Sequence, residues 1–76
     1  MDYELSEKQI EQVTKAFTYH PPKGNQPERY ESIRSTFLAL AFGICQSTPV
    51  SREQSVALTK LEECNMWVNA AIARNE

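Results

Sequence analysis

The segment 18–27 carries the residue types best suited to binding a ligand. It reads TYHPPKGNQP and offers an aromatic ring at Tyr19, an imidazole at His20 and an ammonium group at Lys23. Three prolines prevent a continuous helix and push the residues before them into extended conformations. Gly24 lets the backbone approach a ligand closely. We therefore expect a stiff turn from which Tyr19 and His20 project.

Patterns for catalysis and for metal binding are missing from the sequence. His20 is the single histidine, and no nucleophile, base and orienting acid stand at readable spacing. No CxxC or HxxxH pattern is present, so we expect neither a metal nor a cofactor. Cys45 and Cys64 would lie about 18 Å apart in a helical hairpin, too far for a disulfide. We expect both to be small buried residues.

The length and the net charge of the chain narrow the remaining classes of fold and function. The chain has 76 residues, which predicts a single domain over residues 1–76, and such a small domain usually needs oligomerisation or another support. The net charge of −2 argues against binding to a DNA or RNA polymer. No signal peptide or membrane-spanning run is visible, so the expected compartment is the cytosol and no membrane partner is expected.

The elements that must position the segment 18–27 are all helical. We expect an all-α fold with helices at about 6–17, 27–46 and 51–74, of which the last two form a long antiparallel hairpin. Ser6 with Gln9, and Ser51 with Gln54, are capping boxes, and Pro27 suits the first helical position. The short first helix would pack through three apolar residues at helical spacing: Ile10, Val13 and Phe17.

The two hairpin helices have apolar faces of helical period. In the second helix the predicted stripe consists of Tyr30, Ile33, Phe37, Leu40 or Ala41, and Ile44. In the third helix it consists of Ala57, Leu61, Cys64, Val68 and Ala71, widened by Leu58 and Ile72. A second face of the third helix holds Met66, Trp67 and Ala70, which one hairpin partner cannot easily cover. We expect these three residues to form an oligomer interface.

Several blocks of the sequence resemble a known family. They are F-x-Y-H-x-P from Phe17, Q-x-x-R-Y-x-x-I-R from Gln26, P-x-S-R-E from Pro49, A-L-T-K-L-E-E from Ala57 and M-W-x-N-A-A-I-A-R from Met66. Their order is similar to that of the helical hairpin domain shared by phage anti-CBASS and anti-Thoeris sponges. The resemblance runs from about Phe17 to the C-terminus. The inserted sheet usual in the anti-Thoeris branch is not visible here, which makes binding of ADP-ribose-type signals less expected.

The resemblance implies a binding protein that is not an enzyme. Such sponges sequester cyclic oligonucleotide messengers of bacterial immunity, without cleaving them, in the cytoplasm of the infected host. They form homohexamers, with cyclic dinucleotides between two copies and cyclic trinucleotides where three copies meet. The implied dinucleotide residues are Tyr19, His20, Arg34 and Thr36, and the implied trinucleotide residues are Arg74 and Asn75.

Each of these assignments has a plainer structural alternative. The Tyr19 ring could fold onto the hairpin, Arg34 could be solvated or paired with Glu31, and His20 could be a packing residue. Arg74 could simply be a cation that is favourable near a helix C-terminus. For the whole chain, the alternative function is a small protein-interaction module that binds a host protein through the apolar face of the third helix.

Overall fold

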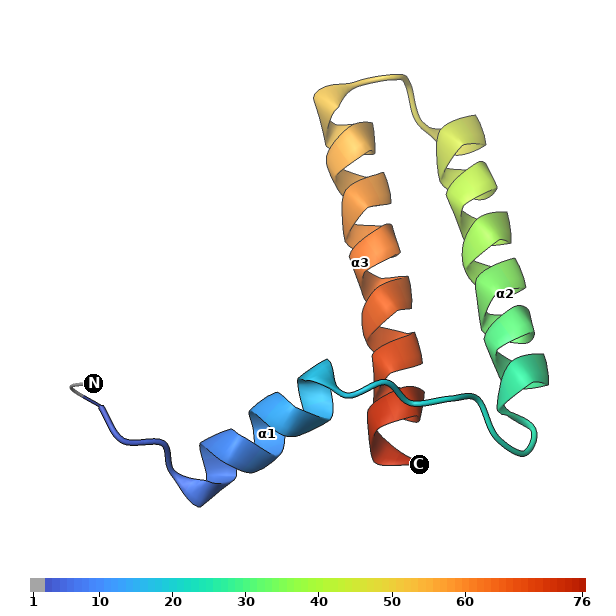
Figure 1. Cartoon of the computed structure of the whole chain (residues 1–76). Coiled ribbons are helices and arrows are strands. Elements are labelled where there is room, and N and C mark those ends of the chain that lie inside the picture. Colours follow the sequence, from blue (N-terminus) through green and yellow to red (C-terminus); the bar gives the residue numbers. More distant parts are fainter. Residues whose placement is uncertain (1–2) are drawn as a thin grey trace.

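A computed structural model describes residues 3–76 and contains three helices (Figure 1). They are α1 (Glu7–Phe17), α2 (Gln26–Ser47) and α3 (Arg52–Asn75), and no strand occurs in this part of the chain. The expected all-helical fold is therefore confirmed, with helix ends that differ from the expected ones by at most one residue. The first two residues of the expected domain lie outside the described range.

Two helix starts are fixed by serine caps, but only one is a complete capping box. Ser6 Oγ accepts from the Gln9 amide at 3.0 Å, and Gln9 Oε1 accepts from the Ser6 amide at 3.0 Å. Ser51 Oγ likewise accepts from the Gln54 amide at 3.1 Å. The Gln54 side chain, however, donates to the carbonyl oxygen and to Oγ1 of Thr48, at 3.1 and 3.0 Å. Only half of the second predicted capping box is therefore observed. Ser51 caps the helix, but the Gln54 side chain bonds to the interhelical turn and not back to Ser51.

The start of α2 also differs from the prediction. The helix begins at Gln26, so Pro27 occupies the second helical position, and the capping residue Asn25 makes no side-chain bond to the helix. A proline is tolerated there because amides in the first helical turn have no partner within the helix.

The helices α2 and α3 lie side by side and antiparallel (Figure 1). The α2 stripe is as predicted, with Ala41 half-buried and Leu40 exposed. The α3 stripe is rotated from the predicted one: it consists of Leu58, Leu61, Asn65, Val68 and Ile72, all half-buried or buried. Ala57 and Ala71 are exposed. The longer side chains of Leu58 and Ile72 bury more apolar surface than the alanines, so they set the rotation of the helix.

The prediction that both cysteines are buried is also wrong. Cys45 and Cys64 are free thiols and both are exposed, not buried. Cys64 loses its predicted place on the inner face for the same reason as Ala57 and Ala71, since the inner face of α3 is centred one residue further along the chain.

The hairpin is a single thin layer. Its smallest dimension is 13 Å and its radius of gyration is 17.0 Å, whereas a compact chain of this length has about 11 Å. Its accessible surface is 6505 Å², whereas a compact folded monomer of this mass exposes about 4,700 Å². Within residues 3–76 only Ile72 (8% exposed) and Gln26 (4%) are buried. The chain thus exposes roughly 1,800 Å² more than a compact monomer would.

The first helix points away from the hairpin and touches it at one end (Figure 1). Lys15 Nζ donates to Asn75 Oδ1 at 2.8 Å, and the His20 ring lies 3.0 Å from the Lys15 carbonyl oxygen. Its apolar stripe remains open: Ile10 and Val13 are exposed, and Phe17 is 87% exposed. In the described part of the chain, none of the helices combines the length and apolarity needed to span a bilayer.

The buried position of Ile72 gives a test of the observed α3 face. We expect Ile72→Ala to lower the free energy of unfolding by about 2–3 kcal/mol, since it removes buried methyl groups and leaves a cavity. Val56→Ala, on an exposed position of the same helix, should change it by no more than about 0.5 kcal/mol. Chemical denaturation followed by circular dichroism measures both; equal effects would contradict the observed packing face.

Candidate functional site

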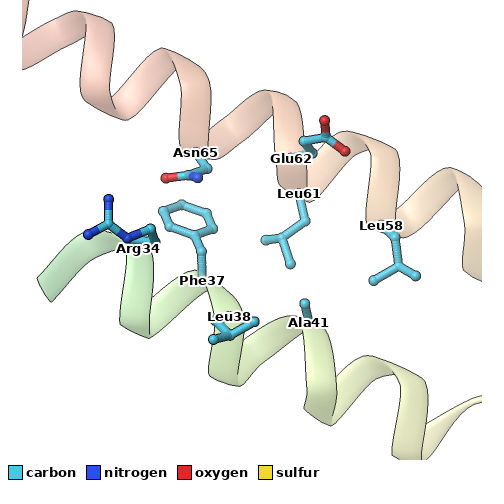
Figure 2. Close-up of a pocket in the computed structure, with 8 residues that line it drawn as sticks. All are labelled: Arg34, Phe37, Leu38, Ala41, Leu58, Leu61, Glu62 and Asn65. Atoms are coloured by element: carbon cyan, nitrogen blue, oxygen red, sulfur yellow. The ribbon is translucent and has the colours of Figure 1, made fainter. Parts of the chain in front are cut away.

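One candidate site is a groove between the two hairpin helices, which we call the interhelical groove (Figure 2). It has a volume of 310 Å³ and is open to solvent. Its lining residues are Arg34, Phe37, Leu38 and Ala41 from α2, and Leu58, Leu61, Glu62 and Asn65 from α3. The middle is apolar, whereas Arg34 and Glu62 place one charge of each sign at its edges. Because both sets recur at spacings of three and four, the groove follows one face of each helix.

The second candidate site lies where the segment 18–25 crosses the end of α3, and we call it the loop depression. It has a volume of 390 Å³. Its lining residues are Ala16, Thr18, Tyr19, His20, Pro22, Tyr30, Asn69, Ala70, Ala73 and Arg74. The Tyr19 side chain is 81% exposed, so the alternative in which its ring folds away against the hairpin is not observed. Two phenol rings, an imidazole and a guanidinium group therefore surround one shallow space.

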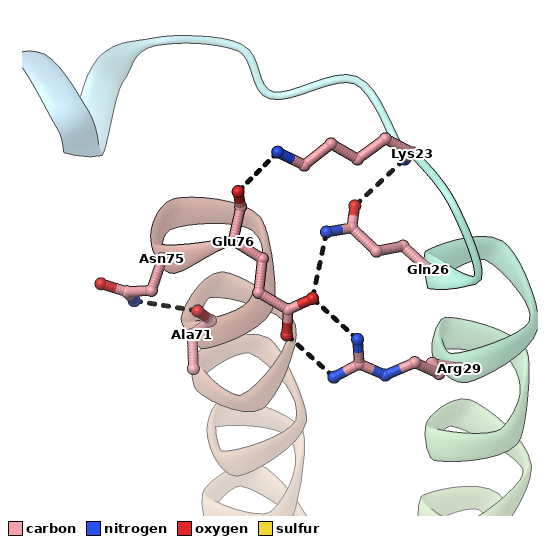
Figure 3. A network of polar contacts seen from close by, with 6 residues as sticks. All are labelled: Lys23, Gln26, Arg29, Ala71, Asn75 and Glu76. Carbon is pink, nitrogen blue, oxygen red and sulfur yellow. Dashed lines mark hydrogen bonds and ion pairs between the residues drawn. The ribbon is translucent and has the colours of Figure 1, made fainter.

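A polar network holds the segment 18–25 against the end of α3 (Figure 3). Arg29 forms a bidentate ion pair with the Glu76 carboxylate, with N–O distances of 2.7 and 2.9 Å. The amide of Gln26 donates to the same carboxylate at 3.4 Å, and its Oε1 accepts from the Lys23 backbone amide at 3.1 Å. Lys23 Nζ also donates to the Glu76 carbonyl oxygen. We call these four residues the C-terminal lock.

One residue with a left-handed backbone conformation makes the sharp turn that leads into the C-terminal lock. Gly24 has a φ of 56°, a conformation that side chains with a Cβ adopt rarely. This turn lets the Gln26 amide hydrogen-bond to the Lys23 carbonyl oxygen at 3.0 Å. Gly24 is thus needed for the turn, whereas the sequence suggested a role in ligand approach.

Arg74 and Asn75, the residues implied for a trinucleotide, both have partners within the chain. The Arg74 guanidinium carbon lies 5.6 Å from the centre of the Trp67 ring, which is 66% exposed. The Asn75 side chain donates to the Ala71 carbonyl oxygen at 2.9 Å and accepts from Lys15. Arg74 is therefore more than a cation at a helix end: it is held over an aromatic face beside the loop depression.

The residues implied for a dinucleotide are divided within one chain. Tyr19 and His20 lie in the loop depression with Arg74, whereas Arg34 lies in the interhelical groove. Thr36 is on the exposed side of α2, and its Oγ1 donates to the Ser32 carbonyl oxygen at 2.9 Å. Among the ion pairs within residues 3–76, none joins Arg34 to Glu31. The Arg34 guanidinium is therefore available to a ligand or to another copy.

Two asparagines that sequence reasoning missed connect the candidate sites. Asn65 lines the groove and Asn69 lines the loop depression. Asn69 Nδ2 donates to Asn65 Oδ1 at 3.3 Å, while the buried Asn69 Oδ1 meets no donor in residues 3–76. Their spacing of four residues on the inner face of an apolar helix is the one available signal. The expected oligomer residues, by contrast, are as accessible as predicted: Met66 and Trp67 are exposed and Ala70 is half-buried.

The arrangement of acidic, histidine and cysteine side chains offers no metal site: within residues 3–76 no three of them come close enough to hold an ion. What the described surfaces offer is an aromatic and cationic depression and an apolar groove with a charge of each sign at its edges.

The C-terminal lock gives a pH test with a defined sign. Hydrogen bonds from Arg29, then from Gln26, hold the pKa of Glu76 below its usual value. A lowered pKa means that the lock is intact above the ordinary carboxyl range and weakens as the pH falls through the lowered value. Amide hydrogen exchange of residues 72–76 should therefore accelerate once the pH falls below the ordinary carboxyl range, after correction for intrinsic rates. Glu76→Gln should show fast exchange at every pH. Wild-type exchange rates that do not change with pH, after the same correction, would contradict the lock.

Comparison with known proteins identifies the family. Residues 9–73 match the family described as "Acb2/Tad1, hairpin domain". Searches of the curated proteins and of the solved structures each gave no match. The matched range includes most of α1, the whole segment 18–25, all of α2, and α3 as far as Ala73, so Arg74 and Asn75 lie just outside it. The chain therefore belongs to the Acb2/Tad1 hairpin-domain family, the family of the anti-CBASS and anti-Thoeris sponges.

Proposed function

We propose that this protein is a phage immune-evasion sponge that binds cyclic di- and trinucleotide messengers of bacterial CBASS and holds them without cleaving them. The observation that carries the proposal is the family match over residues 9–73. The site of action would be the cytoplasm of the infected bacterium, where such messengers are made. The proposal assigns Tyr19, His20, Arg34 and Thr36 to the dinucleotide, and Arg74 with Asn75 to the trinucleotide.

The loop depression has the chemistry that nucleobases require. A base presents a flat aromatic face, and stacking on a protein ring contributes about 1–3 kcal/mol per base. Tyr19 supplies an exposed ring, on a backbone stiffened by two prolines. The C-terminal lock ties down the same loop at Lys23, so less backbone freedom is lost when a base stacks on the ring.

The phosphates of a ligand require cations. A site that combines Arg34 with Tyr19 requires more than one copy of the chain. Arg34 and Arg74 carry guanidinium groups with forked donors, which suit phosphate oxygens. Arg34 and Tyr19 lie in separate sites of one chain, so a dinucleotide that touches both would lie between two copies. The surplus of exposed surface supports a homo-oligomer, and we propose a hexamer on the family resemblance. Arg74, near the end of α3, is assigned to a trinucleotide site between copies together with Asn75.

A second function is favoured by one observation. Trp67 is largely exposed on a helix face that its own hairpin leaves open, and such a ring also suits a protein partner. Under this alternative the chain would be a small interaction module that binds a host protein through α3. A closed homo-oligomer would occupy that face, so measurement of the oligomeric state separates the two functions.

Tyr19→Ala and Arg34→Ala are expected to weaken cyclic dinucleotide binding about tenfold or more each, because a stacked ring or a charged hydrogen bond contributes at least ~1.4 kcal/mol. Tyr3→Ala and Arg52→Ala serve as matched controls on exposed positions outside both sites. Titration calorimetry measures affinity, and light scattering confirms that assembly is unchanged. Wild-type affinity in both site variants would remove this pocket from the proposal.

Arg74→Ala is expected to reduce cyclic trinucleotide affinity about tenfold or more while cyclic dinucleotide affinity stays within about twofold. Because Arg74 also contacts Trp67, the sample must first be shown to have the wild-type oligomeric state. An equal loss for both ligands would indicate that Arg74 acts through assembly.

Sequestration predicts that the ligand leaves the protein unchanged. Heat denaturation of a complex with a cyclic di- or trinucleotide should release the intact ring, measured by liquid chromatography with mass spectrometry. Linear products formed by the pure protein, and absent from a boiled-protein control, would refute a pure sponge and indicate phosphodiester hydrolysis.

A further inference from the structure

A third cavity, which we call the terminal pocket, lies beside the C-terminal lock. It has a volume of 440 Å³, which is within the usual range for small-molecule sites. Its lining residues are His20, Pro21, Pro22, Lys23, Gln26, Ala73, Arg74 and Glu76. His20 and Arg74 also line the loop depression. The wall on the side of the lock, by contrast, consists of groups that the proposed function leaves unassigned.

Hydrogen-bond donors from three side chains converge on Glu76 at this wall (Figure 3). The Arg29 fork donates to both carboxylate oxygens, at 2.7 and 2.9 Å, and Gln26 Nε2 donates to one of them at 3.4 Å. Lys23 Nζ donates to the carbonyl oxygen of the same residue. Two cations and an amide that surround one anion form a donor set suited to phosphate groups. We call Lys23, Gln26 and Arg29 the donor cradle.

The donor cradle is held in place by contacts that do not involve Glu76. The Gln26 backbone amide donates to the Lys23 carbonyl oxygen at 3.0 Å, and the Lys23 backbone amide donates to Gln26 Oε1 at 3.1 Å. Gly24, with a φ of 56°, closes this turn, and Arg29 follows in the first turn of α2. These contacts are local to residues 23–29, whereas Glu76 comes from the other end of the hairpin. Its carboxylate therefore occupies the cradle and does not build it.

The Glu76 carboxylate fills the cradle incompletely and is open to displacement. Gln26 is only 4% exposed, yet its Nε2 lies 3.4 Å from the carboxylate, beyond the usual hydrogen-bond range of about 2.7–3.2 Å. The side chains of Arg29 and Glu76 are each 40% exposed, and ion pairs exposed to this degree are weak. Glu76 also lies beyond the matched range 9–73, so the family match does not include this contact. An anion with more oxygens and more charge can therefore replace the carboxylate.

A phosphate monoester has the oxygens and the charge that the cradle requires. It carries three acceptor oxygens and a charge of about −1.5 to −2 at pH 7, whereas a carboxylate has fewer of both. The Arg29 fork can bind two of these oxygens, and Lys23 with Gln26 can bind the third. A cyclic oligonucleotide contains only phosphodiesters, whose free oxygens are fewer and lie between sugars, so this ligand differs from those of the proposed function. We propose that the donor cradle binds a phosphate monoester and that Glu76 is an internal competitor, which the ligand displaces.

The test is an NMR titration of the full chain with adenosine 5′-monophosphate (AMP) and with inorganic phosphate, at constant ionic strength. Glu76→Gln removes the charge of the competitor and should tighten AMP binding about tenfold, since a cradle that is free about a tenth of the time weakens the apparent affinity by that factor. Adding Arg29→Gln should abolish the gain, whereas adding Arg52→Gln, on an exposed position of α3, should preserve it. Adenosine 3′,5′-cyclic monophosphate, a phosphodiester, should show no gain. Unchanged AMP affinity in Glu76→Gln, or a gain that survives Arg29→Gln, would overturn the proposal.

A second measurement uses the wild-type chain, so it does not depend on the folding of a variant. AMP that displaces Glu76 should release the end of α3 and accelerate amide hydrogen exchange of residues 72–76. Exchange that is unchanged or slower, at an AMP concentration that saturates the chemical shifts, overturns the proposal.

The two probes identify which part of the ligand is bound. A gain for both assigns the phosphate group alone to the cradle, and a gain for AMP alone adds a contact from its nucleoside in the terminal pocket; either result supports the proposal. The inference does not rest on the proposed function, and binding of cyclic dinucleotides is measured separately. If they bind while AMP does not, the phosphate site is wrong and the proposed function stands; if only AMP binds, the reverse holds.

Discussion

A layer only one helix thick cannot bury its own apolar residues, and this constraint explains most of the structure. The smallest dimension of the chain is 13 Å, close to the diameter of a single helix with its side chains. Each hairpin helix can cover only the side of its neighbour that faces it. The open groove, the exposed Trp67 and the bare stripe of α1 are three results of this geometry. None of them can be relieved within one chain without a further layer.

Polar bonds at the two ends of the hairpin compensate for the thin apolar middle. At the closed end, Gln54 holds the turn through two bonds to Thr48. At the open end, Arg29 and Gln26 hold Glu76, so the last residue of the described chain is tied to the start of α2. These bonds fix how far the helices slide past one another, a quantity that an apolar stripe specifies only loosely. They also fix the segment that carries Tyr19.

The sequence predicted the helices well because their signals are local. Serine caps, proline positions and apolar periods act within a few residues, and the α2 stripe followed from them directly. The α3 stripe was misplaced because Ala57, Cys64 and Ala71 are apolar but short, while Asn65 is polar and yet half-buried at the centre of the true face. Side-chain size and the position of a polar residue within the stripe decided the rotation, and a count of apolar residues ignores both.

The candidate site was predictable residue by residue but not as an arrangement. The residue types of the segment 18–27 already indicated ligand binding, since Tyr19 and His20 stand among prolines. That Tyr19 shares a depression with Arg74, more than fifty residues later, depends on where α3 ends relative to the loop. Arg29 and Gln26, which set that relation, read in the sequence as ordinary residues of a helix start. Contacts between distant ends of a hairpin leave no periodic pattern to detect.

The reciprocal cap at Ser6 and Gln9 has a consequence for how α1 forms. Starting a helix is its least favourable step, because several backbone angles are fixed before the first hydrogen bond forms. A complete capping box satisfies two amides at that point, so it lowers the free-energy cost of starting α1. A helix that is already formed loses less conformational entropy when its apolar side is covered than a segment that must fold at that moment. The residues that stabilise the start of α1, Ser6 and Gln9, therefore lie outside its apolar stripe, at the end of the helix furthest from the hairpin.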